Sequence, residues 1–327
     1  MITLAHGAGG RLSHELVNDH FLKYFRGKTL VALEDSAVMG DIALTTDGYV
    51  VTPRFFPGGD IGRLSVCGTV NDLAMVGATP LGLTAGFIIE EGFSIAELDR
   101  IIQSAAQAAG EAGVEIVAGD TKVVARGACD GLFITTAGYG RLHRNFRPSP
   151  SRAEPGDVIL LSGTIGDHGM AVMACREGLP LQGKLESDVA PLADLVAHLR
   201  DGDIDVHALR DPTRGGAAQS LIEISETSRT KMVIEEEALP IKKSVVVATE
   251  LLGIEPLYVA NEGKLVAIVS SKQADRALEI MKTHPRGRHA AIIGRVETGR
   301  PGLEVVTNLG SRRSLRMPQG ELLPRIC

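Results

Sequence analysis

Helical and strand periods alternate along the first half of the 327-residue chain. Apolar residues recur three to four positions apart, which predicts helices, over residues 11–25, 60–77 and 94–113. Alternating or continuous apolar runs predict strands over residues 41–47, 81–90, 114–118 and 131–139. Asp60 and Ser94 stand where helix N-caps are expected, and the unbroken run 114–118 predicts a buried strand.

Residues 147–156 interrupt this pattern with three Pro and one Gly, which is typical of a domain boundary. After residue 156 the alternation of strand and helix periods resumes. Strands are predicted over residues 158–162 and 265–269, and helices near residues 191–199 and 216–227. The sequence therefore predicts a mixed α/β (α+β) protein with two comparable domains, residues 1–148 and 149–307.

Residues 308–327 show neither period. Gly310, Pro318 and Gly320 interrupt this stretch, which favours a mobile tail that ends at Cys327. Fully extended, about 18 residues span about 60 Å, so Cys327 could reach an active site in the same molecule or in a partner. The alternative is a frayed terminus with an incidental cysteine.

Composition narrows the class of protein. The net charge of −6, the aromatic content of 4% and the absence of Trp argue against a nucleic-acid partner. No apolar run approaches a membrane span, and the N-terminus lacks a signal-peptide pattern, so we expect a cytoplasmic protein without a membrane partner. The four cysteines are too scattered for a disulfide framework or a zinc site. The 38 glycines cluster beside acidic residues, which suggests backbone that approaches phosphate or metal.

A glycine-rich loop, residues 6–10, precedes the first predicted helix. Free N–H groups at such a helix start suit an anion. The loop matches neither the P-loop nor the dinucleotide-binding pattern, and a flexible leader explains it equally well.

Acidic residues follow two of the predicted strands. Asp47 ends the strand over 41–47, and Asp120, Thr121 and Lys122 directly follow the run 114–118. Because carboxylates at strand ends face a cleft, we expect Asp120 beside Asp47 if the two strands share a sheet.

Further carboxylates occupy comparable positions. Asn71 and Asp72 lie in an otherwise apolar predicted helix and must be paired or bind a ligand, since an unpaired buried charge is costly. Asp211 precedes a helix that Gly opens. Together these groups favour Mg²⁺, whereas each carboxylate alone is more simply a cap or turn residue. His168 is either a base or a hydrogen-bonded turn residue, and Glu262 in a Gly-adjacent turn is ordinarily solvated.

Seven segments together carry a family resemblance. They are FFPGGDIG (55–62), VCGTVNDLAMVGA (66–78), GDTKVV (119–124), GDHG (166–169), RDPTRGG (210–216), ANEGK (260–264) and the terminal LPRIC. The chain resembles, over nearly its whole length, the HypE family of hydrogenase maturation proteins. That family belongs to the ATP-binding superfamily of aminoimidazole ribonucleotide synthetase and selenophosphate synthetase.

The resemblance implies a carbamoyl dehydratase. The partner carbamoyltransferase HypF would place a carbamoyl group on Cys327. ATP would phosphorylate the amide oxygen, and loss of phosphate would leave a thiocyanate, the source of cyanide ligands for the iron of [NiFe]-hydrogenase. The HypC–HypD complex would receive the product. The resemblance also implies a homodimer that pairs through the N-terminal domains.

The resemblance also assigns roles to residues. Magnesium ligands would be Asp35, Asp47, Asp72, Asp120 and Asp211. ATP contacts would come from Gly7, Gly9, Gly10, Asp47, Asn71, Asp72, Asp120 and Thr121. Glu262 would be the base, while Lys122 would polarise the phosphoryl oxygen or join the proton transfer. The chemistry is consistent, because converting a poor oxygen leaving group into phosphate makes dehydration feasible in water.

Two other functions compete with this interpretation. One is a superfamily relative that makes a different phosphorylated product, although such an enzyme has no use for a tethered terminal cysteine. The other is a binding module whose tail is only a docking peptide. ATP hydrolysis that depends on carbamoylated Cys327 would separate the dehydratase from the docking module.

Overall fold

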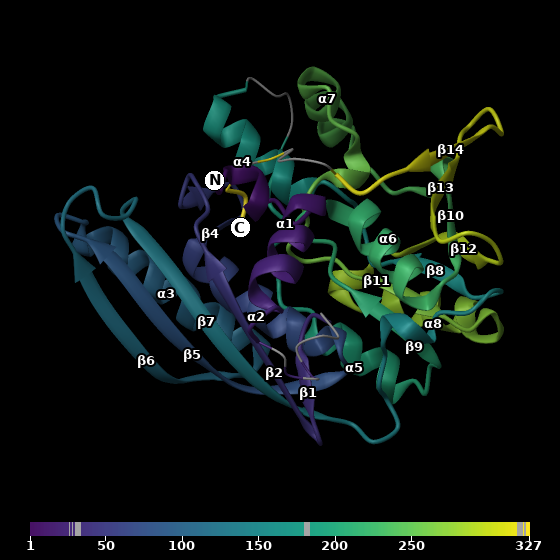
Figure 1. The fold of residues 1–327 in the computed structure, drawn as a ribbon, viewed down its shortest axis with the longest axis horizontal. Coiled ribbons are helices and arrows are strands. Elements are labelled where there is room, and N and C mark those ends of the chain that lie inside the picture. The colour runs from purple at the N-terminus through teal and green to yellow at the C-terminus, as the bar shows by residue number, and fades with distance from the viewer. Residues whose placement is uncertain (26, 28, 30–33, 180–183, 319–322, 324) are drawn as a thin grey trace.

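The computed structural model describes residues 1–25, 27, 29, 34–179, 184–318, 323 and 325–327. Its strands form two large sheets on either side of residues 147–156, so the prediction of two α/β units is confirmed (Figure 1).

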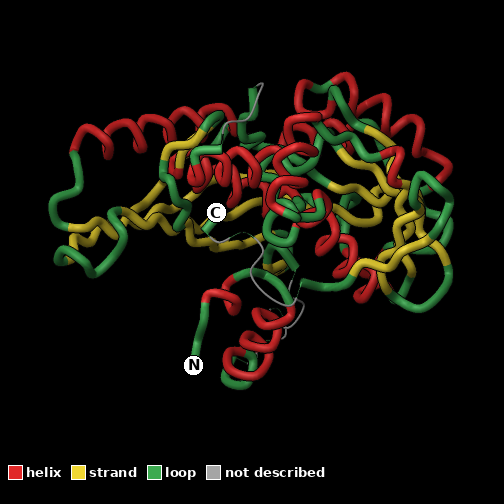
Figure 2. The backbone as a smooth tube through the Cα atoms, turned by 90° about the horizontal axis from the view of Figure 1, so that it is seen from above, coloured by secondary structure: helices red, strands yellow, loops and turns green. Residues whose placement is uncertain are grey.

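The N-terminal sheet has five strands in the order β1 (Ala37–Met39), β2 (Ile42–Tyr49), β7 (Leu132–Leu142), β5 (Ala78–Glu90) and β6 (Glu115–Val124). Helices α2 (Ile61–Met75) and α3 (Ile95–Ala112) cover one face, as Figure 2 shows. The Asp60 carboxylate accepts hydrogen bonds from two backbone N–H groups of α2, and the Ser94 hydroxyl accepts one in α3, so both predicted caps are confirmed. A small hairpin, β3 (Phe55–Phe56) and β4 (Gly59–Asp60), leads into α2.

Within the described residues, no helix covers the opposite face of this sheet, and apolar side chains lie exposed on the strands. Leu44 and Tyr139, which pair across β2 and β7, are examples. The strand β6 is an edge strand, and its residues are exposed along nearly its whole length. The prediction of a buried strand over 114–118 is therefore wrong for the single chain. Ile116 and Val117 are apolar yet exposed. The strand β6 has only one neighbouring strand, β5, and its other edge is open.

The C-terminal sheet has seven strands in the order β14 (Arg312–Leu315), β13 (Gly302–Val306), β10 (Lys231–Glu235), β12 (Ala291–Glu297), β8 (Val158–Leu161), β11 (Val266–Val269) and β9 (Val206–Arg210). Helix α6 (Gly216–Ser228) packs on one face, and α5 (Ala193–Asp201) and α8 (Ala274–Thr283) pack on the other. Nearly all residues of β8, β11 and β9 are therefore buried, whereas β14 at the opposite edge is largely exposed. Helices α4 (Asp167–Glu177) and α7 (Lys243–Leu252) form a separate apolar layer. Short turns of 3-10 helix occur at Pro150–Arg152, Glu236–Ala238, Pro256–Tyr258, Ser271–Gln273 and Pro285–Gly287.

The first residues of the chain lie outside the two sheets, at the junction between the domains (Figure 2). They form the 3-10 helix η1 (Leu4–Gly7), the helix α1 (Arg11–Leu16) and the π-helix η2 (Val17–Phe21). The α-helix is therefore shorter than the one predicted over residues 11–25. This segment is attached to the C-terminal domain, since Gln219 of α6 donates a 2.6 Å hydrogen bond to the Gly9 carbonyl.

The tail is more ordered than the sequence predicts. Arg312–Leu315 forms the strand β14, paired antiparallel with β13. The described residues at the chain end, Leu323 and 325–327, lie between the two domains, and Ile326 is 3% exposed. The expectation of a mobile tail without strand structure is therefore not met in these stretches.

Candidate active site

Five carboxylates from both domains line the junction near the chain end. Asp47 lies on β2, Asp72 on α2 and Asp35 just before β1, while Asp211 follows β9 and Glu262 precedes β11. Burial, followed by repulsion from Asp211, Asp35 and Asp47, raises the pKa of Asp72 well above its usual range. Burial and repulsion from Asp35 raise the pKa of Asp211 to about 8. The carboxylates therefore oppose one another's ionisation, as expected of a site built for a cation.

The fit to Mg²⁺ rests on these donors. Magnesium prefers oxygen ligands, and a divalent ion would offset the repulsion. The Glu262 Oε1 atom is buried and has no hydrogen-bond partner within the described residues. Asp35 is already neutralised by an ion pair with Arg210. In the part of the chain that the structure describes, no three of these carboxylates bring oxygens within 4.8 Å of one another. The residues suit the metal, but they do not form a closed cage around it.

The chain end lies beside this cluster. The Val50 N–H donates a 3.2 Å hydrogen bond to the Cys327 carbonyl, and the Thr52 N–H donates one of 3.2 Å to the Arg325 carbonyl. The Arg325 guanidinium in turn donates to the Val50 carbonyl at 2.9 Å and to Asp130 at 2.6 Å. The last residues thus lie along the segment that extends β2, immediately beyond Asp47.

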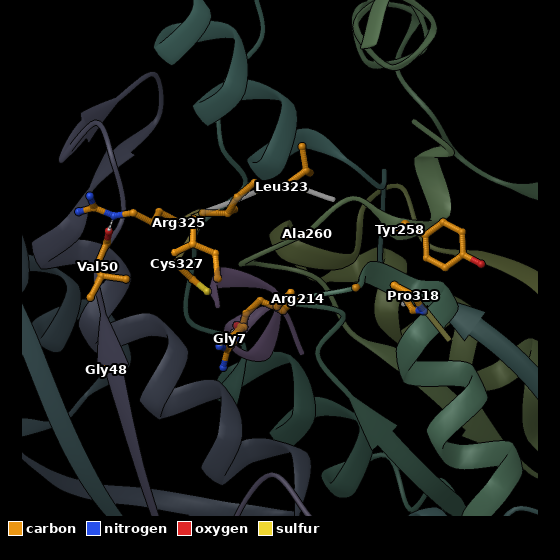
Figure 3. A pocket seen from close by; sticks show the side chains of 14 residues that line it. Gly7, Gly48, Val50, Arg214, Tyr258, Ala260, Pro318, Leu323, Arg325 and Cys327 are labelled. Atoms are coloured by element: carbon orange, nitrogen blue, oxygen red, sulfur yellow. Dashed lines mark hydrogen bonds between the residues drawn. The ribbon is translucent and has the colours of Figure 1, made fainter. Parts of the chain in front are cut away.

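The Cys327 side chain lines a cavity of about 180 Å³ together with Gly7, Gly48 and Arg214 (Figure 3). Burial raises the pKa of the Cys327 thiol to about 12, although the nearby Arg214 guanidinium lowers it. A seated Cys327 is therefore a protonated thiol at neutral pH, and it is a poor nucleophile there.

A strap, residues 186–192, holds Glu262 in place. The Glu262 N–H donates to the Asp188 carboxylate at 3.1 Å, and the Ala190 N–H donates to the Glu262 carbonyl at 3.2 Å. Asp188 also pairs with Lys264 at 3.0 Å. Burial raises the pKa of the 2%-exposed Glu262 side chain well above its usual range, and repulsion from Asp211 adds to the effect. The ordinary expectation of a solvated turn carboxylate is wrong here.

Asn71 joins the domains through the same strap. Its amide N–H groups donate to the carbonyls of Ala190 at 3.1 Å and Glu262 at 3.4 Å, and its carbonyl accepts from the Leu192 N–H at 2.8 Å. The side chain is fully buried. Its requirement for a partner is met within the protein, and its contact with ATP stays a prediction.

The glycine-rich loop borders the same cavity. Arg214 donates to the Gly7 carbonyl at 3.0 Å, and the Arg11 N–H donates to the Pro318 carbonyl at 3.0 Å. A Cβ on Gly10 would collide with the Pro318 carbonyl, and Gly9 has a φ of +82° that favours glycine. Packing against the tail thus explains Gly10, and the positive φ explains Gly9, without a nucleotide.

Family models match both halves of the chain. The N-terminal domain of AIR synthase related proteins matches residues 33–142, and the C-terminal domain matches residues 154–306. Carbamoyl dehydratase HypE of Cupriavidus necator is 50% identical over 332 residues, which span 100% of this chain and 95% of that protein. The chain belongs to the HypE family of hydrogenase maturation proteins. Carbamoyl dehydratase HypE of Escherichia coli is 44% identical over 335 residues, across 100% of this chain and 99% of that protein.

Solved HypE structures match equally well. A HypE–HypF complex aligns with a TM-score of 0.90 at 50% identity, over 93% of this chain and 99% of that one. HypE in complex with ATP aligns with a TM-score of 0.85 at 46% identity, over 99% and 100%. Thiamine monophosphate kinase of Aquifex aeolicus, at 18% identity, 93% and 99% coverage and a TM-score of 0.68, shares the fold alone. No helix in the described part of the chain is long and apolar enough to cross a membrane.

One structural expectation for the HypE-type site is wrong. Asp120, Thr121 and Lys122 lie inside β6 and not at its end. Asp120 shares a cross-strand row with Gly86, Thr135 and Gly48, so its side chain leaves the opposite face from Asp47. Three strand spacings, about 14 Å, separate the two positions. Asp120 instead pairs with Lys122 at 2.6 Å, and both side chains are exposed.

Three residues of the site were not assigned from the sequence. Arg214 was within reach, because it belongs to the RDPTRGG segment and is the cation beside Cys327. His168 lies in a quoted segment but received no role, and the structure places it against the tail. Asp188 of the strap follows no motif, and nothing in the local sequence indicates its burial.

Proposed function

We propose that this protein converts an S-carbamoyl group on Cys327 into a thiocyanate with the consumption of ATP. The observation that carries the proposal is the seating of Cys327 in a cavity beside five carboxylates contributed by both domains. A docking peptide has no need to place a thiol there. Family membership supports the reaction class, since the curated relatives are named carbamoyl dehydratases.

The reaction balances as thiocarbamate plus ATP giving thiocyanate, ADP and phosphate. The carbamoyl oxygen attacks the γ-phosphorus, and ADP leaves. One N–H proton is lost as the O-phosphorylated imidate forms. Loss of the second N–H proton lets the nitrogen electron pair complete the C≡N bond while the C–O bond breaks and phosphate departs. The sulfur–carbon bond to Cys327 persists throughout.

Glu262 fits the role of the base. The raised pKa makes its carboxylate a stronger proton acceptor, and the buried Oε1 has no competing donor in the described residues. The strap fixes its backbone from both sides. Arg214, beside the sulfur, would hold the carbamoyl oxygen as negative charge develops.

Asp47, Asp72 and Asp211 would hold Mg²⁺, with Asp35 less available because of its ion pair with Arg210. When bound, the metal supplies charge neutralisation for the triphosphate. The resemblance places Gly7, Gly9 and Gly10 over the phosphates. That position requires this loop to exchange its contact with Gln219 for contact with nucleotide.

The carbamoyl group must arrive from a partner while Cys327 is outside the cavity, because the thiolate is the nucleophile and the seated thiol is protonated. A solved HypE–HypF complex supports HypF as that partner. Delivery of the product to HypC–HypD completes the proposal.

A homodimer would explain the exposed positions of Asp120, Thr121 and Lys122 on β6. The exposed β6 edge and the helix-free face of the N-terminal sheet offer apolar surface to a second copy. Asp120, Thr121 and Lys122 are remote from Asp47 of their own chain. We propose that they act in the active site of the partner subunit.

Mixing two inactive variants tests this arrangement. Cys327→Ala lacks the substrate thiol, and Lys122→Ala lacks the lysine, yet a mixed dimer contains one site with both groups if Lys122 acts across the interface. We expect the one Cys327 thiol of that dimer to be converted, so that about half of all Cys327 thiols react in a mixture whose subunits exchange statistically. If Lys122 acts within its own chain, the mixture stays inactive.

Intact-protein mass spectrometry tests the reaction itself. After incubation with HypF, carbamoyl phosphate, ATP and Mg²⁺, Cys327 should gain about 43 Da, and this adduct should fall to about 25 Da as ATP is consumed. Cys327→Ala should bind ATP normally and gain neither mass. ATP turnover without an adduct on Cys327 would mean that the tail is only a docking peptide and that the substrate is a small molecule.

A further inference from the structure

The imidazole of His168 is fully buried, and the proposed reaction does not use it. It lies in the first turn of α4, where Phe56 of the N-terminal domain contacts it edge to face, with ring centroids 5.3 Å apart. Its Nδ1 atom lies 2.8 Å from the Ser187 hydroxyl of the strap, and its Nε2 atom lies 2.9 Å from the Ile326 carbonyl. One ring thus contacts the N-terminal domain, the strap and the tail.

The direction of these hydrogen bonds follows from the donors available. A carbonyl only accepts, so Nε2 must carry the proton that goes to Ile326. In the neutral ring Nδ1 is then an acceptor, and the Ser187 hydroxyl donates to it. The Ser187 oxygen in turn accepts from the Val189 N–H at 3.1 Å. Burial lowers the pKa of His168, which agrees with a neutral ring.

The bond to Ile326 acts directly on the cysteine. The Ile326 carbonyl belongs to the peptide group that joins Ile326 to Cys327, so holding it fixes the plane from which the Cys327 side chain projects. Other contacts anchor the flanking atoms. Arg176 donates to the Arg325 carbonyl at 2.8 Å, and the Ile326 side chain packs with Met170 and Val259.

We propose that His168 and Ser187 form a latch that holds the peptide between Ile326 and Cys327 and thereby keeps the sulfur in the cavity beside Arg214. His168 is a positioning residue, because it acts through the tail backbone and not on the reacting atoms. Its catalytic meaning rests on the proposed dehydratase function, whereas its effect on seating can be measured without any turnover.

The alkylation rate of Cys327 in the full-length protein measures seating, since a thiol outside the cavity ionises more readily and reacts faster with iodoacetamide. A protease that cleaves after Glu releases the terminal hexapeptide LLPRIC for quantification. The exposed Cys175 serves as the internal reference. His168→Phe keeps a ring of similar size but loses both hydrogen bonds. His168→Gln offers an amide N–H near the position of Nε2. His289→Phe, an exposed histidine, is the matched control.

We expect His168→Phe to react about five to ten times faster at Cys327, as loss of one buried hydrogen bond predicts, with the Cys175 rate unchanged. His168→Gln should return the rate to within about twofold of the parent protein. Ser187→Ala, which keeps the ring but removes its orienting donor, should react about two to five times faster. His289→Phe should match the parent.

Parent-like alkylation in folded His168→Phe would overturn the latch. If that variant melts early, Ser187→Ala decides, and a parent rate there overturns the latch equally. If Gln fails to restore the rate and Ser187→Ala reacts like the parent protein, the hydrogen bonds of His168 do not seat the cysteine and the latch is overturned. If the variants show the expected alkylation rates but the protein never forms thiocyanate, the latch is supported and the dehydratase function is refuted. If thiocyanate forms but the His168 and Ser187 variants alkylate at the parent rate, only the latch is refuted.

Discussion

Replacing Asp211 by Asn should stabilise the free protein at neutral pH while weakening its binding of Mg–ATP. Asp211 is buried beside Asp35, and its pKa is raised to about 8. The carboxylate is thus held against its preference to ionise, in a position that serves a cation. Asn has nearly the same shape and no charge, so the substitution removes the repulsion and a metal ligand together.

The sign and size of the effect follow from proton linkage. The folded protein keeps a proton on Asp211 that the unfolded chain loses above about pH 4. Stability therefore falls as pH rises from about 4 towards 8, by at most about 1.4 kcal/mol per pH unit. At pH 7 this amounts to about 4 kcal/mol as an upper limit. Asn does not titrate, so this part of the slope should disappear in the variant.

Urea unfolding followed by circular dichroism between about pH 5 and pH 8 measures the slope, and urea adds no ionic strength. Asp201→Asn is the matched control, because Asp201 is exposed and pairs with Arg200. Equal slopes for Asp211→Asn and the parent protein would refute a protonated, buried Asp211. Unchanged Mg–ATP affinity would remove Asp211 from the metal site.

Two further substitutions test the junction between the domains. Asn71→Ala leaves the Leu192 N–H and the Ala190 carbonyl without their partner. The free energy of unfolding measured in urea should therefore fall by about 2–4 kcal/mol. A decrease below about 0.5 kcal/mol would contradict the bridging role. Gly263→Ala places a Cβ against the Asp188 backbone and should lower the melting temperature. Gly110→Ala in α3, where a Cβ meets nothing within 4 Å, should add up to about 1 kcal/mol, so similar melting of the two variants would contradict the packing argument.

Local signals predicted the elements of the fold well. The caps at Asp60 and Ser94 and the αL glycine at Gly113 define helix ends through hydrogen bonds within a few residues, so the sequence contains all the information needed. The domain boundary inferred from Pro and Gly at residues 147–156 stays a prediction. The acidic residues Asp47 and Asp72 were predicted to share a site. Repulsion from Asp47 contributes to the raised pKa of Asp72, while their shared role as metal ligands stays a prediction.

The errors concern contacts between distant segments. The apolar run at 114–118 predicts burial, but the sequence does not say whether its own chain or a second copy covers it. The tail lacks any period because its ordering comes from Val50, Arg176 and His168, which lie more than 140 positions away in the chain. Glu262 is buried by the strap, whose residues have no recognisable pattern.

The continuation of β2 sets a distance that the length of the tail does not affect. Asp47 lies on this strand, and three residues later Val50 holds the chain end, an offset of about 10 Å along the strand. Residues added to the tail before its anchored end would leave that offset unchanged. One residue inserted between Asp47 and Val50 would lengthen it and invert the side-chain alternation. If Asp47 holds Mg–ATP and Cys327 carries the carbamoyl group, as we propose, this offset fixes the spacing between them, and the tail only has to be long enough to reach Val50.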